Sequence, residues 1–151
     1  MSESVAIIPT YNESGNINNI LENIQDLSIK FDVIVVDDNS PDGTGDIIKD
    51  LIVKKKFNIN ITLIERKVKD GLGSAYIEGF KKAISLNYKF IFQIDCDGSH
   101  NPKKLIEMKK TLVNDSDIVV GSRYIKGISV LHWPLPRLLL SIFANYYVKF
   151  I

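Results

Sequence analysis

Short runs of branched apolar residues alternate along this chain with longer segments in which apolar residues recur every three or four positions. A continuous apolar run is typical of a strand that is buried on both faces, and such strands occur in parallel sheets covered by helices. The pattern therefore predicts an α/β fold, with a mostly parallel open sheet and helices on both faces. Short apolar runs that predict strands lie at residues 5–8, 33–36, 90–94 and 118–120, and residues 59–64, which alternate weakly, predict a further strand.

Helices are expected between these strands. Apolar side chains at helical spacing cover residues 17–27, 47–52 and 75–84, and each set forms one face of an amphipathic helix. A further helix is expected to begin at Asn101 and Pro102, because Asn is a favourable N-cap and Pro suits the first helical position. The chain has 151 residues and shows no repeat or linker before residue 126, so we expect a single domain.

The composition excludes several classes of protein. Nineteen Lys and Arg residues stand against eighteen Asp and Glu residues, and this balance argues against a protein held by the phosphates of a nucleic acid. Cys96 is the only cysteine, which rules out an intrachain disulfide and a Cys-rich zinc site. We find no signal-peptide pattern and no stretch of about 20 apolar residues that could span a membrane. We therefore expect a soluble cytoplasmic domain.

The candidate site follows from the direction of the predicted strands. Ligands of open parallel sheets bind at the carboxyl ends of the strands, so the residues that follow each run are the informative ones. Polar loops, carboxylates and an arginine follow four of the five runs, at residues 9–13, 37–43, 95–100 and 121–124. We expect them to gather at one edge of the sheet.

Asp95 and Asp97 are two carboxylates, separated by one residue, directly after a predicted strand. Such a pair offers hard oxygen ligands to Mg²⁺ or Mn²⁺ and leaves other positions for water and phosphate. The alternative is a turn that caps the following helix, although Asn101 is already available as a cap. The spacing alone leaves both interpretations open.

A second acidic pair, Asp37 and Asp38, follows another strand. Adjacent carboxylates repel one another unless a donor or a cation lies between them, so Asp38 is a candidate to accept hydrogen bonds from a base or a ribose. Tyr11 and Glu13 suit the same task, with the aromatic ring stacking on a base. The alternative is a simple turn, which residues 40–43 favour.

The glycine segment 70–75 has neither the spacing of a dinucleotide-binding fingerprint nor the Gly-Lys-Ser/Thr of a P-loop. We interpret it mainly as a loop that lets the next helix approach the sheet, with a ligand contact as the alternative. All but three of the Lys and Arg residues are lysines, and the three arginines are Arg66, Arg123 and Arg137. Arginines that persist in so lysine-rich a chain are candidates for specific roles.

The last segment, residues 137–151, has polar side chains at every fourth position, namely Arg137, Ser141, Asn145 and Lys149. On a helix these residues form one narrow polar stripe, and the remaining surface is apolar. Such a helix is either buried against other protein or lies at a membrane interface, and 15 residues are too few to span a bilayer. Both interpretations stay open.

Taken together, five motifs resemble those of family 2 glycosyltransferases of the GT-A fold, a Rossmann-like nucleotide-diphospho-sugar transferase fold. The motifs are PTYNE, VVDDNSPDGT, GLGSAYIEGFKKA, DCDGSHNP and GSRY, and they occur in the family's order. Within the family, the chain is most similar to dolichol-phosphate and other polyprenyl-phosphate mannosyltransferases. The resemblance implies one catalytic domain over residues 1–151, with its C-terminal part missing and residues 137–151 as an apolar helix that faces the acceptor.

The resemblance also implies roles for individual residues. Cys96 and the pair Gly98-Ser99 depart from the residues that are commoner in the family, but neither departure removes a ligand. Asp95, Asp97 and Arg123 would act in catalysis, with Mg²⁺ or Mn²⁺ held by the two aspartates, and Arg137 would bind the acceptor phosphate. The implied donor-binding residues are Pro9, Tyr11, Glu13, Val36, Asp38, Asp95, Cys96, Asp97, Ser99 and Arg123.

The activity implied is inverting transfer of mannose from GDP-mannose to a polyprenyl or dolichyl phosphate, as in protein glycosylation. The protein would then be peripheral on the cytosolic face of a membrane, which in a eukaryote would be the endoplasmic reticulum. A membrane-anchoring subunit is a possible partner. A lipid phosphate has a second pKa of about 6 and needs no general base. The alternatives are a UDP-sugar-dependent transferase with a carbohydrate acceptor and a truncated nucleotide-binding domain without turnover.

Overall fold

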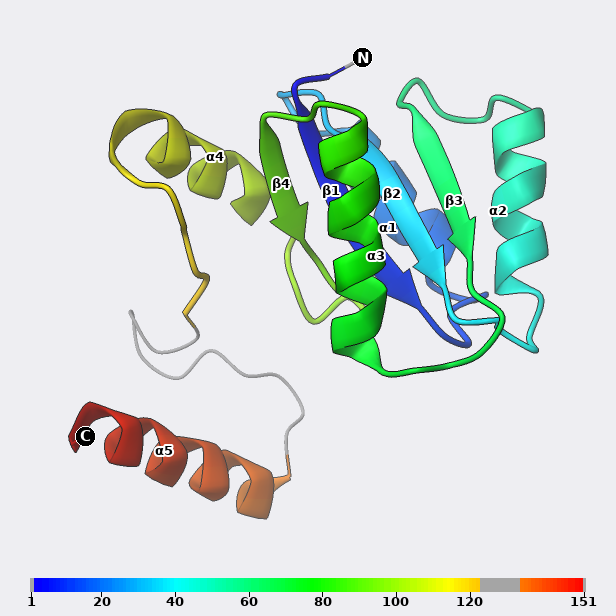
Figure 1. The fold of residues 1–151 in the computed structure, drawn as a ribbon. Helices are drawn as coiled ribbons and strands as arrows, with labels where there is room; N and C mark the ends of the chain where they lie inside the picture. The colour runs from blue at the N-terminus through cyan, green and yellow to red at the C-terminus, as the bar shows by residue number, and fades with distance from the viewer. Residues whose placement is uncertain (1, 123–133, 151) are drawn as a thin grey trace. The chain divides into compact units, whose positions relative to one another are not determined.

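The computed structural model describes residues 2–122 and 134–150 (Figure 1). The chain divides into two compact units, Met1–Val119 and Val120–Ile151. The first unit is a parallel sheet covered by helices, and the second contains one helix, α5 (Leu135–Phe150). The described part of the chain therefore has the predicted α/β architecture in its first unit.

Within residues 2–122 and 134–150, the sheet has four parallel strands in the order β3-β2-β1-β4. From β1 the chain adds β2 and β3 on one side and then returns to place β4 on the other side. The carboxyl ends of β1 and β4 therefore flank a topological switch point, which is where open α/β sheets bind ligands. The strands are β1 (Ser4–Thr10), β2 (Asp32–Asp37), β3 (Ile61–Glu65) and β4 (Phe90–Gln93), and the helices between and after them are α1 (Ile17–Gln25), α2 (Thr44–Val53), α3 (Leu72–Ser85) and α4 (Lys104–Asp115).

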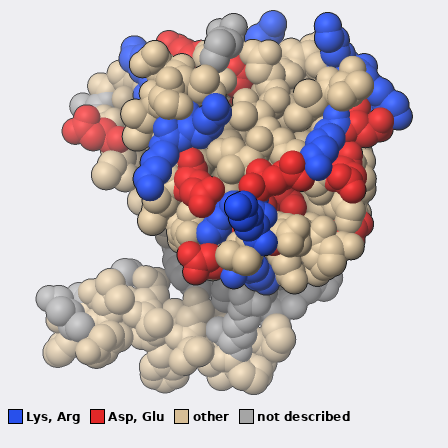
Figure 2. All heavy atoms as spheres, turned by 45° about the vertical axis from the view of Figure 1, so that its right-hand side comes forward, with Lys and Arg blue, Asp and Glu red and all other residues tan. Residues whose placement is uncertain are grey.

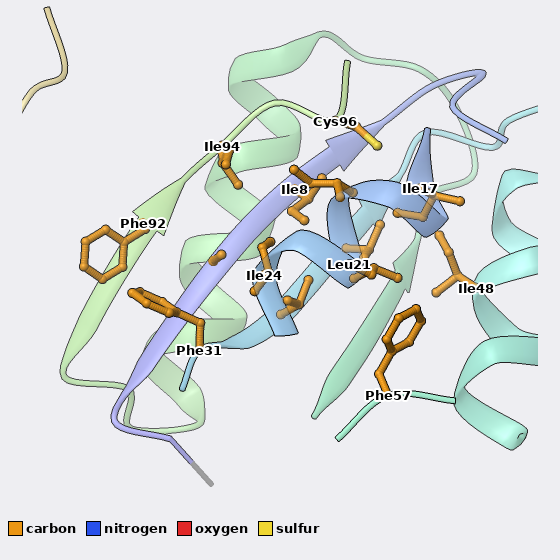
Figure 3. Close-up of a cluster of buried hydrophobic side chains, with 14 of the residues drawn as sticks. Ile8, Ile17, Leu21, Ile24, Phe31, Ile48, Phe57, Phe92, Ile94 and Cys96 are labelled. Atoms are coloured by element: carbon orange, nitrogen blue, oxygen red, sulfur yellow. The ribbon is translucent and has the colours of Figure 1, made fainter. Parts of the chain in front are cut away.

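The central strands β1 and β2 are buried on both faces, and alternate residues enter two separate cores. Ala6 and Ile8 of β1 face the larger cluster, which contains side chains of α1, α2 and α4 (Figure 3). Val5 and Ile7 of the same strand face the smaller cluster under α3. Figure 1 shows α3 in front of the sheet and α1 behind it. This two-sided burial is why the strands read as continuous apolar runs.

At Gly79, α3 lies close against Ile7 of β1. A Cβ atom placed there would lie 2.5 Å from Cγ2 of Ile7, which is shorter than any normal contact. In the segment 70–75, where we expected a loop that permits close packing, a Cβ on Gly71 or Gly73 would meet nothing within 4 Å. The helix therefore does approach the sheet closely, but the glycine that permits it lies further along α3.

Two predicted features of the chain beyond β4 were wrong. Residues 118–120 do not form a strand, and Ile118 and Val120 are about 80% exposed. A run of only three residues makes few ladder hydrogen bonds, and hydrophobicity alone does not pair it with a neighbour. The helix predicted to begin at Asn101 begins at Lys104 as α4. Asn101 Oδ1 accepts a hydrogen bond from the Lys103 backbone, so Asn101 organises the preceding turn instead.

Helix α5 contains most of the segment predicted to be an amphipathic helix. Large apolar side chains on it, including Leu140, Phe143 and Tyr147, are strongly exposed. Within the described residues, none of the helices combines the length and the hydropathy that a membrane crossing requires. The interfacial role of this helix stays a prediction.

Charged residues of both signs are mixed on the face of the first unit shown in Figure 2. Lys49 of α2, for example, pairs with Glu65 at 2.7 Å and with Asp46 at 3.2 Å. These side chains are about half exposed or more, and such pairs contribute at most about 1 kcal/mol each. Such exposed pairs therefore contribute little to the stability of the fold.

Candidate functional site

A pocket with a volume of about 230 Å³ opens at the carboxyl ends of β1 and β4, at the switch point of the sheet. It is built from the loops after β1, β2 and β4 and from the segment that leads into α3. Most of the predicted donor-site residues come together here from distant parts of the chain. The lining residues are Pro9, Thr10, Tyr11, Glu13, Asp38, Lys69, Leu72, Ala75, Asp95, Cys96 and Asp97.

The loops after β1 and β2 are tied together by backbone-to-side-chain hydrogen bonds. The backbone amides of Glu13 and Ser14 donate to Thr44 Oγ1 and Asp42 Oδ2 at 3.0 and 2.9 Å. The Thr44 hydroxyl in turn donates to Asp42 and holds the pKa of that carboxyl well below its usual range. The turn sequence at residues 40–43 thus fixes the loop that carries Tyr11 and Glu13.

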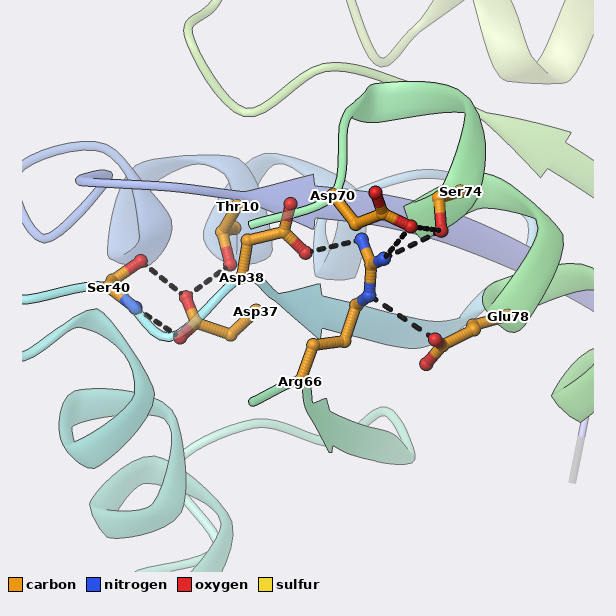
Figure 4. A network of polar contacts seen from close by, with 8 residues as sticks. All are labelled: Thr10, Asp37, Asp38, Ser40, Arg66, Asp70, Ser74 and Glu78. Atoms are coloured by element: carbon orange, nitrogen blue, oxygen red, sulfur yellow. Dashed lines mark hydrogen bonds and ion pairs between the residues drawn. The ribbon is translucent and has the colours of Figure 1, made fainter. Parts of the chain in front are cut away.

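Asp37 is a structural member of the acidic pair. Its Oδ1 accepts hydrogen bonds from the hydroxyls of Thr10 and Ser40, at 2.8 and 2.6 Å, and its Oδ2 accepts one from the Ser40 backbone (Figure 4). These donors satisfy the buried carboxylate without any ligand. The turn interpretation therefore fits Asp37, while Asp38 is the member that lines the pocket.

Asp38 forms a buried ion pair with Arg66, whose Nη1 lies 2.7 Å from Oδ1. The Arg66 side chain also donates to Ser74 Oγ at 2.6 Å and lies 3.3 Å from a Glu78 oxygen (Figure 4). One guanidinium thus joins the ends of β2 and β3 to helix α3. The repulsion expected between Asp37 and Asp38 is relieved by these donors and this cation. Sequence reasoning singled out Arg66 as a retained arginine but did not identify its partner.

Lys69 is a pocket residue that sequence reasoning missed. Its Nζ lies 3.6 Å from the centre of the Tyr11 ring, at cation–π distance. Tyr11 is the residue expected to stack on a base, and its ring is 38% exposed. The position of Lys69, just before the glycine segment that borders the pocket, was the available signal.

Asp95 and Asp97 both line the pocket, and each has a local partner. The Tyr76 hydroxyl donates to Asp95 Oδ1 at 3.0 Å, and the Asp95 backbone amide donates to His100 Nδ1 at 3.3 Å. Burial, and then the Asp95 charge, raise the pKa of Tyr76, so its hydroxyl stays a proton donor. Sequence analysis assigned no role to Tyr76.

The Asp97 carboxylate accepts a hydrogen bond from Ser99, two residues further along the chain. Hydrogen bonding from Ser99 lowers the pKa of the Asp97 carboxyl, and the Ser99 backbone amide lies 2.9 Å from Oδ1. The two aspartates are hard oxygen donors of the kind that Mg²⁺ and Mn²⁺ prefer. In the described part of the chain, no group of three or more His, Cys, Asp and Glu side chains could hold a metal ion. Any ion bound by these two aspartates therefore needs further oxygen ligands from outside that set.

The other predicted site residues lie as follows. The Val36 side chain is fully buried in the smaller core and does not line the pocket. Burial raises the pKa of the Cys96 thiol to about 12, so the side chain is a neutral part of the pocket floor. Arg123 lies outside the described residues, and so does the side chain of Arg137. Their assignments stay predictions.

Among proteins of known name, this chain is 36% identical to the polyprenol monophosphomannose synthase of Mycolicibacterium smegmatis, over 98% of this chain and 55% of that protein. It is 37% identical to the undecaprenyl-phosphate mannosyltransferase of Micrococcus luteus, over 96% of this chain and 58% of that protein. The chain thus spans little more than half the length of these relatives.

Solved structures show the same fold. The mannosyltransferase PcManGT from Pyrobaculum calidifontis, solved with GDP-Man and Mn²⁺, matches 54% of this chain and 24% of its own, with a TM-score of 0.50 and 30% identity. S. aureus TarS (residues 1–349) matches 83% of this chain and 40% of its own, with a TM-score of 0.62 and 22% identity, which concerns the fold alone. The sequence profile of glycosyl transferase family 2 matches residues 5–150. With its GT-A-like sheet and its pocket at the switch point, this chain belongs to glycosyl transferase family 2.

Proposed function

We propose that this chain binds the donor of a polyprenyl-phosphate mannosyltransferase, which moves mannose from GDP-mannose to a polyprenyl or dolichyl phosphate. The observation that carries the proposal is the pocket that joins Tyr11, Glu13 and Asp38 to Asp95 and Asp97. A nucleoside diphosphate needs such a site, with an aromatic ring and acceptors at one end and hard oxygen ligands at the other. The names of the two relatives and the GDP-Man in the PcManGT structure support the sugar and the acceptor.

In this proposal the nucleoside lies against Tyr11, with Glu13 and Asp38 accepting hydrogen bonds from its base and ribose. Asp95 and Asp97 hold Mg²⁺ or Mn²⁺ together with the donor diphosphate and water. The bound ion supplies charge neutralisation as negative charge builds on the leaving diphosphate. The Asp97 carboxyl suits this task, because an aspartate is ionised at neutral pH and hydrogen bonding from Ser99 lowers its pKa further.

The acceptor phosphate is its own nucleophile. Since its second pKa is about 6, it is largely dianionic at neutral pH and needs no general base. One of its oxygens attacks the anomeric carbon from the face opposite the diphosphate, and the bond to the leaving oxygen breaks with its electron pair. The configuration at that carbon is inverted, and GDP departs. In this scheme Arg123 and Arg137 bind phosphate groups of donor and acceptor.

Helix α5 suits an acceptor that is embedded in a lipid surface. Its exposed side chains include Leu139, Leu140, Phe143 and Phe150, and its length allows it to lie in an interface. We therefore place the chain at the cytosolic face of a membrane, with α5 against the lipid.

Calorimetric titration with GDP and with UDP, with and without Mn²⁺, tests the donor assignment. We expect GDP binding that depends on Mn²⁺ and is lost in Asp97→Asn, a change that keeps the shape of the side chain. Lys49→Met, on the surface of α2, is the matched control and is expected to bind as the unchanged chain does. A preference for UDP would overturn the proposal in favour of a UDP-sugar transferase. A folded chain that binds neither nucleotide would overturn the idea that this chain binds the donor by itself.

A further inference from the structure

Tyr76 of α3 reaches across the sheet edge to Asp95. Its ring packs against the smaller core, beside Ala75 and Phe80, and its hydroxyl donates to Asp95 Oδ1 at 3.0 Å. Because the ring is partly buried against this core, its freedom is restricted and its hydroxyl is held near Asp95. The hydrogen bond therefore fixes the orientation of the Asp95 carboxylate.

The second oxygen of Asp95 lies beside His100. His100 Nδ1 is 3.4 Å from Oδ2 and also accepts the backbone amide proton of Asp95 at 3.3 Å. The Asp95 side chain is 37% exposed, and the residue lines the pocket. Oδ1 thus accepts a hydrogen bond from the partly buried Tyr76 phenol, and the carboxylate stays partly exposed at the pocket that a cation would enter.

We propose that Tyr76 is a positioning residue that presents Asp95 to the divalent cation of the donor. The inference rests on the proposed function, because it takes Asp95 as a ligand of that cation. Groups that hydrogen-bond to a metal ligand orient it, and their loss typically weakens metal binding about 10- to 100-fold. Tyr76 does this from the first half of α3, directly after the glycine segment 70–75.

The chain contains a matched control for this contact. The Tyr88 hydroxyl donates to Asp32 Oδ2 at 2.9 Å, an almost identical Tyr–Asp hydrogen bond. Asp32 is the first residue of β2, so this bond lies at the amino-terminal edge of the sheet, opposite the pocket. Asp32 also accepts hydrogen bonds from Ser2 and Asn60, which marks its role as structural. Removing the hydroxyl of Tyr76 or of Tyr88 breaks the same kind of hydrogen bond, but only the bond of Tyr76 involves a pocket residue.

The test compares Tyr76→Phe, Tyr88→Phe and Asp95→Asn with the unchanged chain. Free Mn²⁺ is measured by electron paramagnetic resonance during titration in the presence of GDP, and the melting temperature of each variant is recorded. We expect Tyr76→Phe to raise the Kd for Mn²⁺ about 10-fold or more and Tyr88→Phe to leave it within about twofold. Both variants are expected to lower the melting temperature by similar small amounts, since each loses one hydrogen bond.

The outcomes separate the two proposals. The first case is that the unchanged chain binds Mn²⁺ with GDP, Asp95→Asn abolishes this binding, and Tyr76→Phe binds Mn²⁺ like Tyr88→Phe. Tyr76 then has only a packing role, so this inference is overturned while the proposed function stands. If Asp95→Asn binds Mn²⁺ like the unchanged chain, the assignment of Asp95 as a ligand fails, and the role of Tyr76 fails with it. The spectrum of bound Mn²⁺ gives a second readout, and a change in its zero-field splitting in Tyr76→Phe but not in Tyr88→Phe supports the inference.

Discussion

Arg66 and Asp38 form an ion pair with their side chains only 6% and 7% exposed, and Nη1 lies 2.7 Å from Oδ1. The register of the sheet explains the pair, because Asp37 of β2 lies opposite Glu65 of β3 and the next residues of both strands emerge side by side. Asp38 therefore enters the pocket as a carboxylate already held by a fixed cation. A ligand that meets it meets an oriented acceptor rather than an isolated charge.

Replacing Arg66 with Met is expected to destabilise the fold by roughly 3–5 kcal/mol, because it leaves the Asp38 charge buried without a partner. Urea unfolding measures this loss. Lys49→Met provides the control, since Lys49 and Glu65 are also 2.7 Å apart but half exposed, and its cost is expected to stay below about 1 kcal/mol. Equal costs for the two variants would contradict the importance of burial for the Arg66 pair.

Gly79→Ala is expected to destabilise the chain by about 1–3 kcal/mol, since the added methyl group would overlap Ile7 between α3 and β1. Gly73→Ala in the same helix is the control. A Cβ there meets nothing within 4 Å, so the better helix propensity of Ala is expected to add up to about 1 kcal/mol. Thermal unfolding of both variants distinguishes the two signs, and a stabilised Gly79→Ala would disprove the close contact.

Acid is expected to weaken the junction between the loops after β1 and β2. The Thr44 hydroxyl holds the pKa of Asp42 below its ordinary value of 3.8. A carboxyl whose pKa is lowered by folding contributes stability that is fully present above the unfolded-state pKa and is lost as the pH falls towards the folded-state value. Melting temperatures between pH 5 and pH 2 are therefore expected to fall less steeply in Asp42→Asn than in the unchanged chain. Parallel slopes would show that this carboxyl does not contribute.

The fold and the edge that carries the site were predictable because they depend on local patterns. Apolar runs of β-branched residues identified all four strands, and the acidic residues at their ends identified the pocket. Residues 118–120 show the limit of this reasoning, because hydrophobicity does not show whether a neighbouring strand is available. The partners of Asp38 and Asp95 could not be predicted from local sequence patterns either. Arg66 and Tyr76 reach these aspartates only through strand register and helix packing, which no spacing along the chain encodes.

Arg137→Ala tests the acceptor assignment. We expect it to reduce mannosyl transfer to a polyprenyl phosphate at least about 10-fold, because a charged partner of a phosphate is worth about 1.5–3 kcal/mol. GDP affinity, measured by calorimetry, is expected to stay unchanged. Mannosyl transfer is assayed with the full-length protein that contains this chain. The polyprenyl phosphate concentration is varied so that KM and kcat are obtained separately. A parallel loss of GDP binding and transfer would argue against a role confined to the acceptor.

Membrane binding by α5 is expected to depend on its apolar side chains rather than on its polar stripe. Phe143 is 72% exposed, and burying such a side chain is worth about 2 kcal/mol, so Phe143→Glu is expected to weaken binding to vesicles at least about 10-fold. Asn145→Glu adds the same charge on the polar stripe of the same helix and is expected to have a much smaller effect. Co-sedimentation with phosphatidylcholine vesicles, which carry no net charge, isolates the apolar contribution from electrostatic attraction. Because the two variants have the same net charge, a difference between them reports which face of α5 meets the lipid, and equal binding would mean that this helix packs against protein instead.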